Sequence, residues 1–244
     1  MLKQNIFRLP CRAFISPRKD REGFTLSEIL ITLVLMGTVM ALTIPSMTQR
    51  TNKNAYVAGL KKTYGVLDTA TSQIMTNNAG TLIQAFPDSD EIVTKYCSIL
   101  ECNKICTAGN SVSDGCFNAQ ADIRMLNDLT FIDDPNSGIF SGFVLADGIL
   151  VTAAIVGTAG ACDYTYMGVT SICGWINLDV NGIKGPNIFG KDIFTFDITK
   201  DKIIPTGLEG SRTDYSLYCD QTSANVQNGE GCAGRVLTEG AMNY

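Results

Sequence analysis

Histidine is missing from the sequence altogether, since none of its 244 residues is His. Histidine is the commonest general base of enzymes and a frequent zinc ligand. Its absence excludes catalytic pairs of histidine with serine or cysteine, and most zinc sites. No nucleophile motif of another kind is present. The sequence therefore predicts a protein that is not an enzyme, and it offers no catalytic residue.

An excess of positive charge is missing as well. The chain has 19 Lys and Arg against 24 Asp and Glu, which gives a net charge of −5. The first 23 residues contain six basic and two acidic residues, a charge of +4, so the rest of the chain carries −9. Binding to nucleic acid needs clustered lysine and arginine to neutralise phosphates. The acidic balance makes nucleic acid an unlikely partner and leaves room only for a local basic patch.

The sequence contains one long apolar run, from Gly23 to Pro45, with a single charge at Glu28. A helix rises about 1.5 Å per residue, so residues 24–44 would be ~32 Å long and would cross a hydrocarbon core of ~30 Å. A carboxylate in that layer costs on the order of 3 kcal/mol. Glu28 therefore needs a partner or a functional reason.

These residues resemble the N-terminus of type IV pilins and type II secretion pseudopilins. In that family a leader ends in glycine, prepilin peptidase cuts after it, the new N-terminal phenylalanine is methylated, and the fifth residue is glutamate. Gly23, Phe24 and Glu28 occupy those positions, and the segment TLSEILITLVLMG fits the apolar start. Pro45 is the twenty-second residue after the cut, where many members carry a helix-loosening proline. We expect a kink there, because proline removes one backbone hydrogen bond.

The resemblance implies a structural subunit of a type IV pilus, a type II secretion pseudopilus or a DNA-uptake pseudopilus. The implied partners are copies of the chain or other pilins and pseudopilins, prepilin peptidase, and an inner-membrane assembly platform. In a filament, Glu28 would face the Phe24 amine of a neighbouring subunit, and such a charge-assisted contact is strong in a low dielectric. A basic leader stays on the cytoplasmic side, so this single-pass chain would place its C-terminal part outside the cytoplasmic membrane, in the periplasm.

Other interpretations of the N-terminus are a secretory signal peptide and an ordinary membrane anchor. A signal peptide needs small residues at its cut, and Ala41-Leu42-Thr43 is a poor version of that site. An apolar segment of either kind seldom contains an acid such as Glu28. The alternative from another functional class is a membrane-anchored or secreted cysteine-rich hydrolase, which the missing histidine argues against.

Of the nine cysteines, Cys11 lies in the leader and eight lie in the exported part. An even set in an oxidising compartment indicates disulfides, and the spacing C-x4-C-x3-C-x9-C lacks the paired C-x2-C units of structural zinc. Eight cysteines allow on the order of a hundred pairings, among which we favour local ones. Cys162 and Cys173 flank a short loop, and Cys219 and Cys232 resemble the pair that closes a C-terminal loop in many pilins. The disulfide candidates are Cys97, Cys102, Cys106, Cys116, Cys162, Cys173, Cys219 and Cys232.

Residues 24–76 are predicted to form one long helix, whose first half, residues 24–44, is the membrane span and filament core. Beyond Pro45, apolar residues recur at helical spacing, and Asn77-Asn78-Ala79-Gly80 is a stop signal. Tyr56 and Tyr64 are expected to pack this helix against a globular domain.

The globular domain is predicted over residues 77–244, as a cysteine-rich part of helices and loops (77–138), an antiparallel sheet (139–206) and a C-terminal loop region (207–244). Short helices are expected from Ser89 and over Ala119–Leu129. Asp147-Gly148 and Asn181-Gly182 are hairpin dipeptides between apolar runs. The predicted fold class is α+β, a disulfide-stapled pilin-like domain in which the long helix packs on an antiparallel sheet of about four to five strands.

A second, weaker resemblance to pilin-like proteins lies in the segment LDVNGIKGPNIFGKD, in which a D-x-N-G turn precedes G-P-N. Asp179, Asn181 and Asp192 are weak candidates for calcium ligands there, since some pseudopilins bind calcium in a C-terminal loop. No glutamate follows at the spacing of an EF-hand. We favour an Asn-Gly turn with solvated acids, and therefore predict no metal and no other cofactor.

Overall fold

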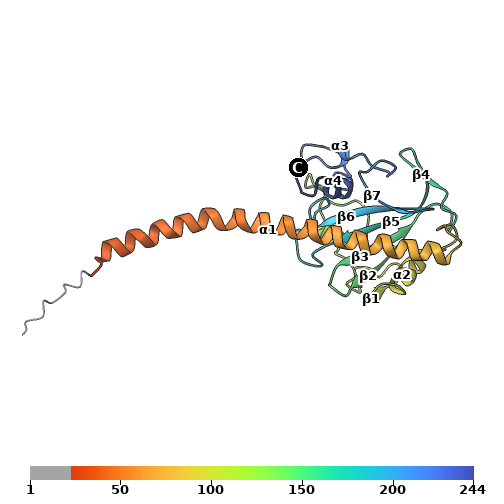
Figure 1. Ribbon diagram of the computed structural model, residues 1–244, viewed down its shortest axis with the longest axis horizontal. Coiled ribbons are helices and arrows are strands. Elements are labelled where there is room, and N and C mark those ends of the chain that lie inside the picture. The colour runs from red at the N-terminus through yellow and green to blue at the C-terminus, as the bar shows by residue number, and fades with distance from the viewer. Residues whose placement is uncertain (1–22) are drawn as a thin grey trace, which may run out of the picture. The chain divides into compact units, whose positions relative to one another are not determined.

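The computed structural model describes residues 23–244, so residues 1–22 of the leader, with Cys11, lie outside the described residues. Helix α1 spans Leu26–Asn77, close to the predicted helix. The chain divides into two compact units, one ending at Met47 and the other comprising Thr48–Tyr244, so α1 belongs to both. Its backbone is helical through Pro45, and the kink there stays a prediction. Figure 1 shows α1 and the elements of the second unit.

The predicted stop signal ends α1. The backbone N–H groups of Asn78 and Gly80 both donate to the Met75 carbonyl, at 2.9 and 2.8 Å. Ala79 and Gly80 have positive φ values of 55° and 80°, which turn the chain out of the helix. A glycine suits this position because it adopts the left-handed conformation without a Cβ penalty.

The second unit is built on a seven-stranded antiparallel sheet with strand order β1-β2-β3-β5-β6-β7, to which β4 adds by pairing with β5. The strands are β1 (Cys102–Cys106), β2 (Phe140–Leu145), β3 (Leu150–Ile155), β4 (Tyr164–Tyr166), β5 (Val169–Asp179), β6 (Ile193–Thr199) and β7 (Ile203–Pro205). The predicted α+β class is confirmed, and the Asp147-Gly148 hairpin joins β2 to β3 as expected.

The predicted number of four to five strands was wrong. The two strands that the sequence did not reveal are β1 and β4. Strand β1 lies at a sheet edge with three exposed residues in succession, so it lacks the apolar alternation that marks a strand. Strand β4 has only three residues, too few for a period to show.

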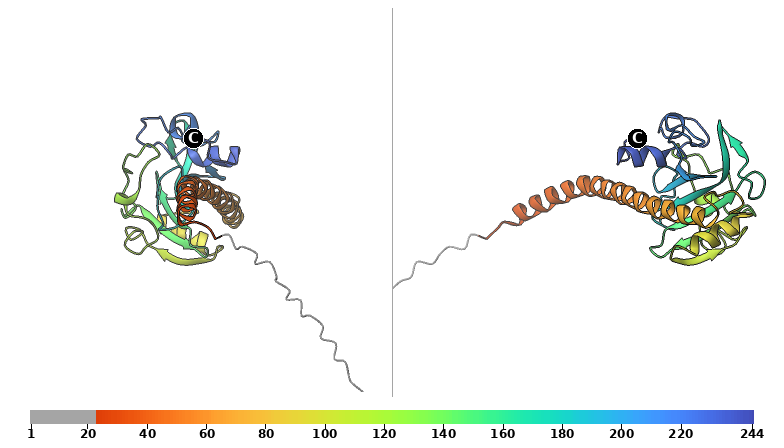
Figure 2. Two further views of the ribbon diagram at one scale, coloured as in Figure 1. Left: turned by 90° about the vertical axis from the view of Figure 1, so that its left-hand side faces the viewer. Right: turned by 45° about the vertical axis from the view of Figure 1, so that its right-hand side comes forward.

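Helix α1 packs one face of its second half on the sheet. Leu60, Leu67 and Ile74, which recur every seven residues, are buried in one cluster with Phe194 and Phe196 of β6. Tyr64 stacks on Phe196 with ring centroids 5.7 Å apart, and Tyr56 also packs against this cluster, so the predicted packing role of both tyrosines is confirmed. Figure 2 shows α1 beside the sheet.

The opposite face of the sheet is covered by the chain around residues 117–131. Phe117, Ile123, Met125 and Phe131 are buried in a second cluster with Ile193 of β6. The helix predicted over Ala119–Leu129 was wrong, because only the short 3₁₀ helix η1 (Gln120–Asp122) forms there. Ile123 and Met125 are buried two residues apart, which is the period of an extended chain.

The other helices are short. Helix α2 (Ser89–Cys97) starts close to the expected position, and the Asp88 side chain caps it by accepting from the Glu91 N–H at 2.8 Å. The C-terminal region, predicted as loops, also contains α3 (Tyr215–Tyr218) and α4 (Cys232–Glu239), so that prediction was incomplete. In the described part of the chain, four disulfides each join one cysteine to the next cysteine along the sequence: Cys97–Cys102, Cys106–Cys116, Cys162–Cys173 and Cys219–Cys232.

Candidate functional site: the N-terminal segment and the D-x-N-G loop

Gly23, Phe24 and Thr25 precede α1 in a short stretch without helical or strand structure. The Phe24 side chain is 83% exposed. No heavy atom other than those of its chain neighbours lies within 4 Å of the point where a Cβ on Gly23 would stand. The bond between Gly23 and Phe24 is therefore open to a processing enzyme, and no packing within the described chain requires a glycine there.

Glu28 closes the first turn of α1. One of its oxygens, Oε2, accepts from the Thr25 backbone N–H at 2.8 Å and from the Thr25 hydroxyl at 2.7 Å. The Glu28 N–H donates back to the Thr25 hydroxyl at 3.3 Å. This is a capping box, in which a threonine and a glutamate three residues later satisfy helix N–H groups that have no partner inside the helix. The capping role of Glu28 was not predicted, although the T-x-x-E signature in the sequence indicates it.

The rest of the apolar run is not packed against any other described part of the chain. Every residue from Gly23 to Ile44 is exposed, including the bulky side chains of Leu26, Val34 and Leu42. Within the described residues, α1 is the one helix long and apolar enough to cross a membrane. Such a surface is compatible with a membrane anchor, or with packing against other helices.

A comparison with models of known families matches residues 18–44 to the prokaryotic N-terminal methylation motif. The chain carries the prepilin-type signature. This signature of type IV pilins and pseudopilins contains the cut site predicted from Gly23 and Phe24, and also Glu28. No curated protein and no solved structure matched the chain. The motif supports a precursor of pilin-like or pseudopilin type, and it indicates a structural protein.

The D-x-N-G loop, residues 180–192, joins β5 to β6 in this prepilin-like chain. It is longer than the two-residue hairpin that Asn181-Gly182 predicted. Asp179, just before the loop, and Asp192, its last residue, are both completely buried, so the expectation of solvated acids was wrong. Asp179 accepts from the Asn181 N–H at 3.1 Å and from the Asn118 amide at 2.7 Å. Asp192 accepts from the N–H groups of Asn187 and Ile188 at 2.8 and 2.7 Å, and both acids thereby hold the loop.

The electrostatics of the loop favour a neutral carboxyl. Burial, and next the nearby Asp192 carboxylate, raise the pKa of Asp179 to about 8. Burial also raises the pKa of Asp192, against the two N–H groups that lower it. Two buried carboxylates close together cannot both ionise without cost, unless a proton or a cation compensates them.

The prediction of no metal in this loop, with Asp179, Asn181 and Asp192 as weak candidates for calcium ligands, stays a prediction. The side-chain oxygens of Asn181 and Asn187 are buried without a hydrogen bond, and amide oxygens suit a hard cation. However, no group of three or more Asp, Glu, Cys or His in the described part of the chain is placed to hold a metal. A cation here would take its remaining ligands from amide or backbone oxygens and from water.

We expect the free energy of unfolding to fall as the pH rises from 5 to 9. The folded chain keeps a proton on Asp179 up to pH ~8, whereas an unfolded aspartate loses it near pH ~4, so the raised pKa favours folding at low pH and that advantage is lost across this window. Asp179→Asn should therefore make the free energy of unfolding fall less steeply with pH. Denaturant titrations of the full chain in detergent at several pH values would measure it.

Asp122→Asn, at an exposed aspartate, is the matched control and should keep the slope of the wild type. If the free energy of unfolding fell equally with pH in Asp179→Asn and in the wild type, the pH dependence would not arise from Asp179.

The same denaturant titrations, with calcium or with a chelator, test whether the loop binds a metal. A bound cation would stabilise the wild type more at pH 9 than at pH 5, and would not stabilise Asp179→Asn.

Proposed function

We propose that the chain is the precursor of a structural subunit of a type IV pilus or a type II secretion pseudopilus. Prepilin peptidase cuts it after Gly23, Phe24 is methylated, and the subunit polymerises through residues 24–44. The observation that carries this proposal is an exposed apolar helix with one acid, which starts at Leu26, two residues after an open Gly23–Phe24 bond. Side-by-side packing of such helices in a filament would bury their apolar surface.

The capping geometry supports a role for Glu28 in assembly. Cleavage after Gly23 leaves the Thr25 N–H in a peptide bond, so the capping contacts survive processing. Both of these contacts use Oε2, and within the described part of the chain Oε1 accepts no hydrogen bond. Oε1 is therefore available to face the Phe24 amine of a neighbouring subunit, and the capped rotamer holds it in place for that contact.

The compartment follows from the same proposal. Four disulfides in the second unit support an oxidising compartment, and the basic leader supports insertion with that unit in the periplasm. The subunit then moves from the cytoplasmic membrane into a filament. Its partners are copies of itself or related pilins, prepilin peptidase and an assembly platform in the inner membrane.

Mass spectrometry of the mature N-terminus tests this proposal. In cells that contain prepilin peptidase, we expect a chain that starts with methylated Phe24, and in cells without the peptidase we expect an intact leader. A start near Thr43 would indicate a secretory signal peptide. An intact leader in the presence of active peptidase would favour a simple membrane anchor, which is also the form that an anchored hydrolase would take.

A further inference from the structure

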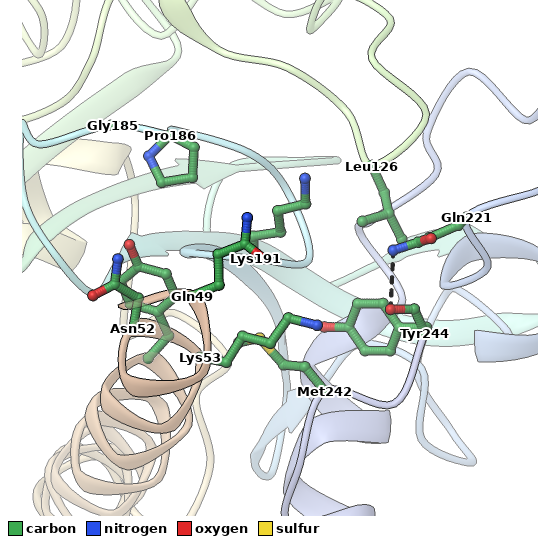
Figure 3. A pocket seen from close by; sticks show the side chains of 11 residues that line it. Gln49, Asn52, Lys53, Leu126, Gly185, Pro186, Lys191, Gln221, Met242 and Tyr244 are labelled. Atoms are coloured by element: carbon green, nitrogen blue, oxygen red, sulfur yellow. Dashed lines mark hydrogen bonds between the residues drawn. The ribbon is translucent and has the colours of Figure 1, made fainter. Parts of the chain in front are cut away.

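A groove of about 530 Å³ in the second unit, here named the basal groove, brings α1 and the D-x-N-G loop together. Gln49, Asn52 and Lys53 line it from α1, Gly185, Pro186 and Lys191 line it from the loop, and Leu126, Met242 and Tyr244 are among its other residues. Figure 3 shows the lysines and the amide side chains around the groove. Two lysines and no acid are among its lining residues, in a chain that is acidic overall.

The covalent chain keeps the basal groove close to the membrane. Gln49 is five residues beyond Ile44, where the apolar run ends, and Lys53 is nine residues beyond it. At about 1.5 Å per helical residue, the chain between them keeps these positions within ~8 and ~14 Å of the end of the span. The polar layer on each side of the hydrocarbon core is roughly 5–8 Å thick. When the span lies in a membrane, a lysine side chain on this turn of the helix is therefore within reach of the lipid headgroups.

The loop that supplies Gly185 and Pro186 to the basal groove also carries an exposed apolar side chain two residues earlier. Ile183 is 74% exposed, and exposed Lys184 separates it from Gly185. The Asn181 side-chain amide fixes this part of the loop by donating to the Gly185 carbonyl at 3.2 Å and to the Tyr56 hydroxyl at 3.3 Å. An apolar residue beside lysines is typical of surfaces that lie in a membrane interface.

We propose that the basal groove binds the headgroup of an anionic phospholipid of the membrane that holds the span. Lys53 and Lys191 contact the lipid phosphate, and Ile183 enters the interface beside it. The inference rests on the membrane insertion contained in the proposed function. Phospholipid is favoured over other anions because the short stretch of chain between the span and Lys53 limits their distance, and anionic lipid is locally concentrated at the headgroup layer and attracts lysines.

Native mass spectrometry of the full chain in detergent, titrated with phosphatidylglycerol or phosphatidylcholine, tests this site. We expect the wild type to retain phosphatidylglycerol preferentially. Each lysine contributes about fivefold to binding at an anionic surface, so Lys53→Gln with Lys191→Gln should lower that affinity about 30-fold. Lys200→Gln with Lys202→Gln removes the same charge from exposed lysines around the β6–β7 turn, and should have no comparable effect.

Depth quenching provides the second measurement. Ile183→Trp in bilayers with brominated lipid should show quenched fluorescence, whereas Ile132→Trp, at another exposed isoleucine, should show only the background of Trp175. A chain that inserts but shows equal lipid preference in the Lys53/Lys191 variant and the wild type would overturn the proposal. So would inorganic phosphate that abolishes the preference, since this indicates a site for free anions. A chain that fails to insert at all would instead refute the proposed function.

Discussion

Glu28→Gln should almost abolish incorporation into filaments, while the chain is still inserted in the membrane and still cut after Gly23. Glutamine, like glutamate, can accept the backbone hydrogen bond at the third position of a capping box, so this variant keeps the start of α1. It loses the negative charge, and the Phe24 amine of the neighbouring subunit then has no counter-charge in a low dielectric. Leaving one partner of a buried pair uncompensated costs about 3–5 kcal/mol, a factor of a hundred or more for each contact.

Thr25→Val is the complementary change. It removes the hydroxyl that exchanges hydrogen bonds with Glu28, at 2.7 and 3.3 Å, but leaves the carboxylate charged. Loss of a helix cap costs about 1 kcal/mol, so filaments should persist with at most a modest drop in yield. The two variants thus separate the charge of Glu28 from its capping role.

The yield of sheared filaments, measured against the amount of subunit in the membrane, is the readout for both variants. If Glu28→Gln assembles normally and Thr25→Val does not, Glu28 serves only to cap the helix. The pairing with Phe24 would then be wrong, although the processing of the precursor would stand.

Local patterns were enough to predict much of this fold. The apolar run, the helix stop at Asn77 and the Asp147-Gly148 hairpin depend on residues close together in sequence. The disulfide Cys162–Cys173 was suggested by the short loop between its cysteines, and Cys219–Cys232 by the resemblance to pilins. At the N-terminus, Gly23, Phe24 and Glu28 were recognisable because their spacing is fixed by a motif.

Features set by distant contacts were not predictable in the same way. Asp179 and Asp192 looked like solvated turn residues, because nothing in their neighbourhood shows that Asn118 and the loop amides bury them. The extended chain through Ile123 and Met125 depends on the sheet face that it covers. The basal groove joins residues of α1 to residues more than a hundred positions away.

The buried ion cluster around Arg212 is the clearest case of such long-range order. The Arg212 side chain contacts Asp197 of β6 at 2.9 Å and Glu230 at 3.2 Å. Its backbone N–H donates to the other Asp197 oxygen at 2.7 Å, and its guanidinium lies 4.6 Å from the Trp175 ring centroid. All three charged side chains are buried. Burial raises the pKa of both acids, and Arg212 opposes that rise.

Arg212→Met should therefore destabilise the second unit by about 3–5 kcal/mol, since it leaves Asp197 and Glu230 buried without their cation. Both acids would then take up protons more readily, so the loss should be larger at pH 8 than at pH 5, because folding would require the uptake of protons that are scarce at high pH.

Denaturant titration of the full chain in detergent measures this effect, with Arg50→Met at an exposed arginine of α1 as the control. Adding Asp197→Asn and Glu230→Gln to Arg212→Met removes the two uncompensated charges together. Replacing all members of a buried ion cluster is often nearly neutral, whereas breaking one pair is not. Partial recovery in the triple variant would thus show that the cost lies in the unpaired acids. A loss no larger than that of Arg50→Met would show that the cluster contributes little to stability.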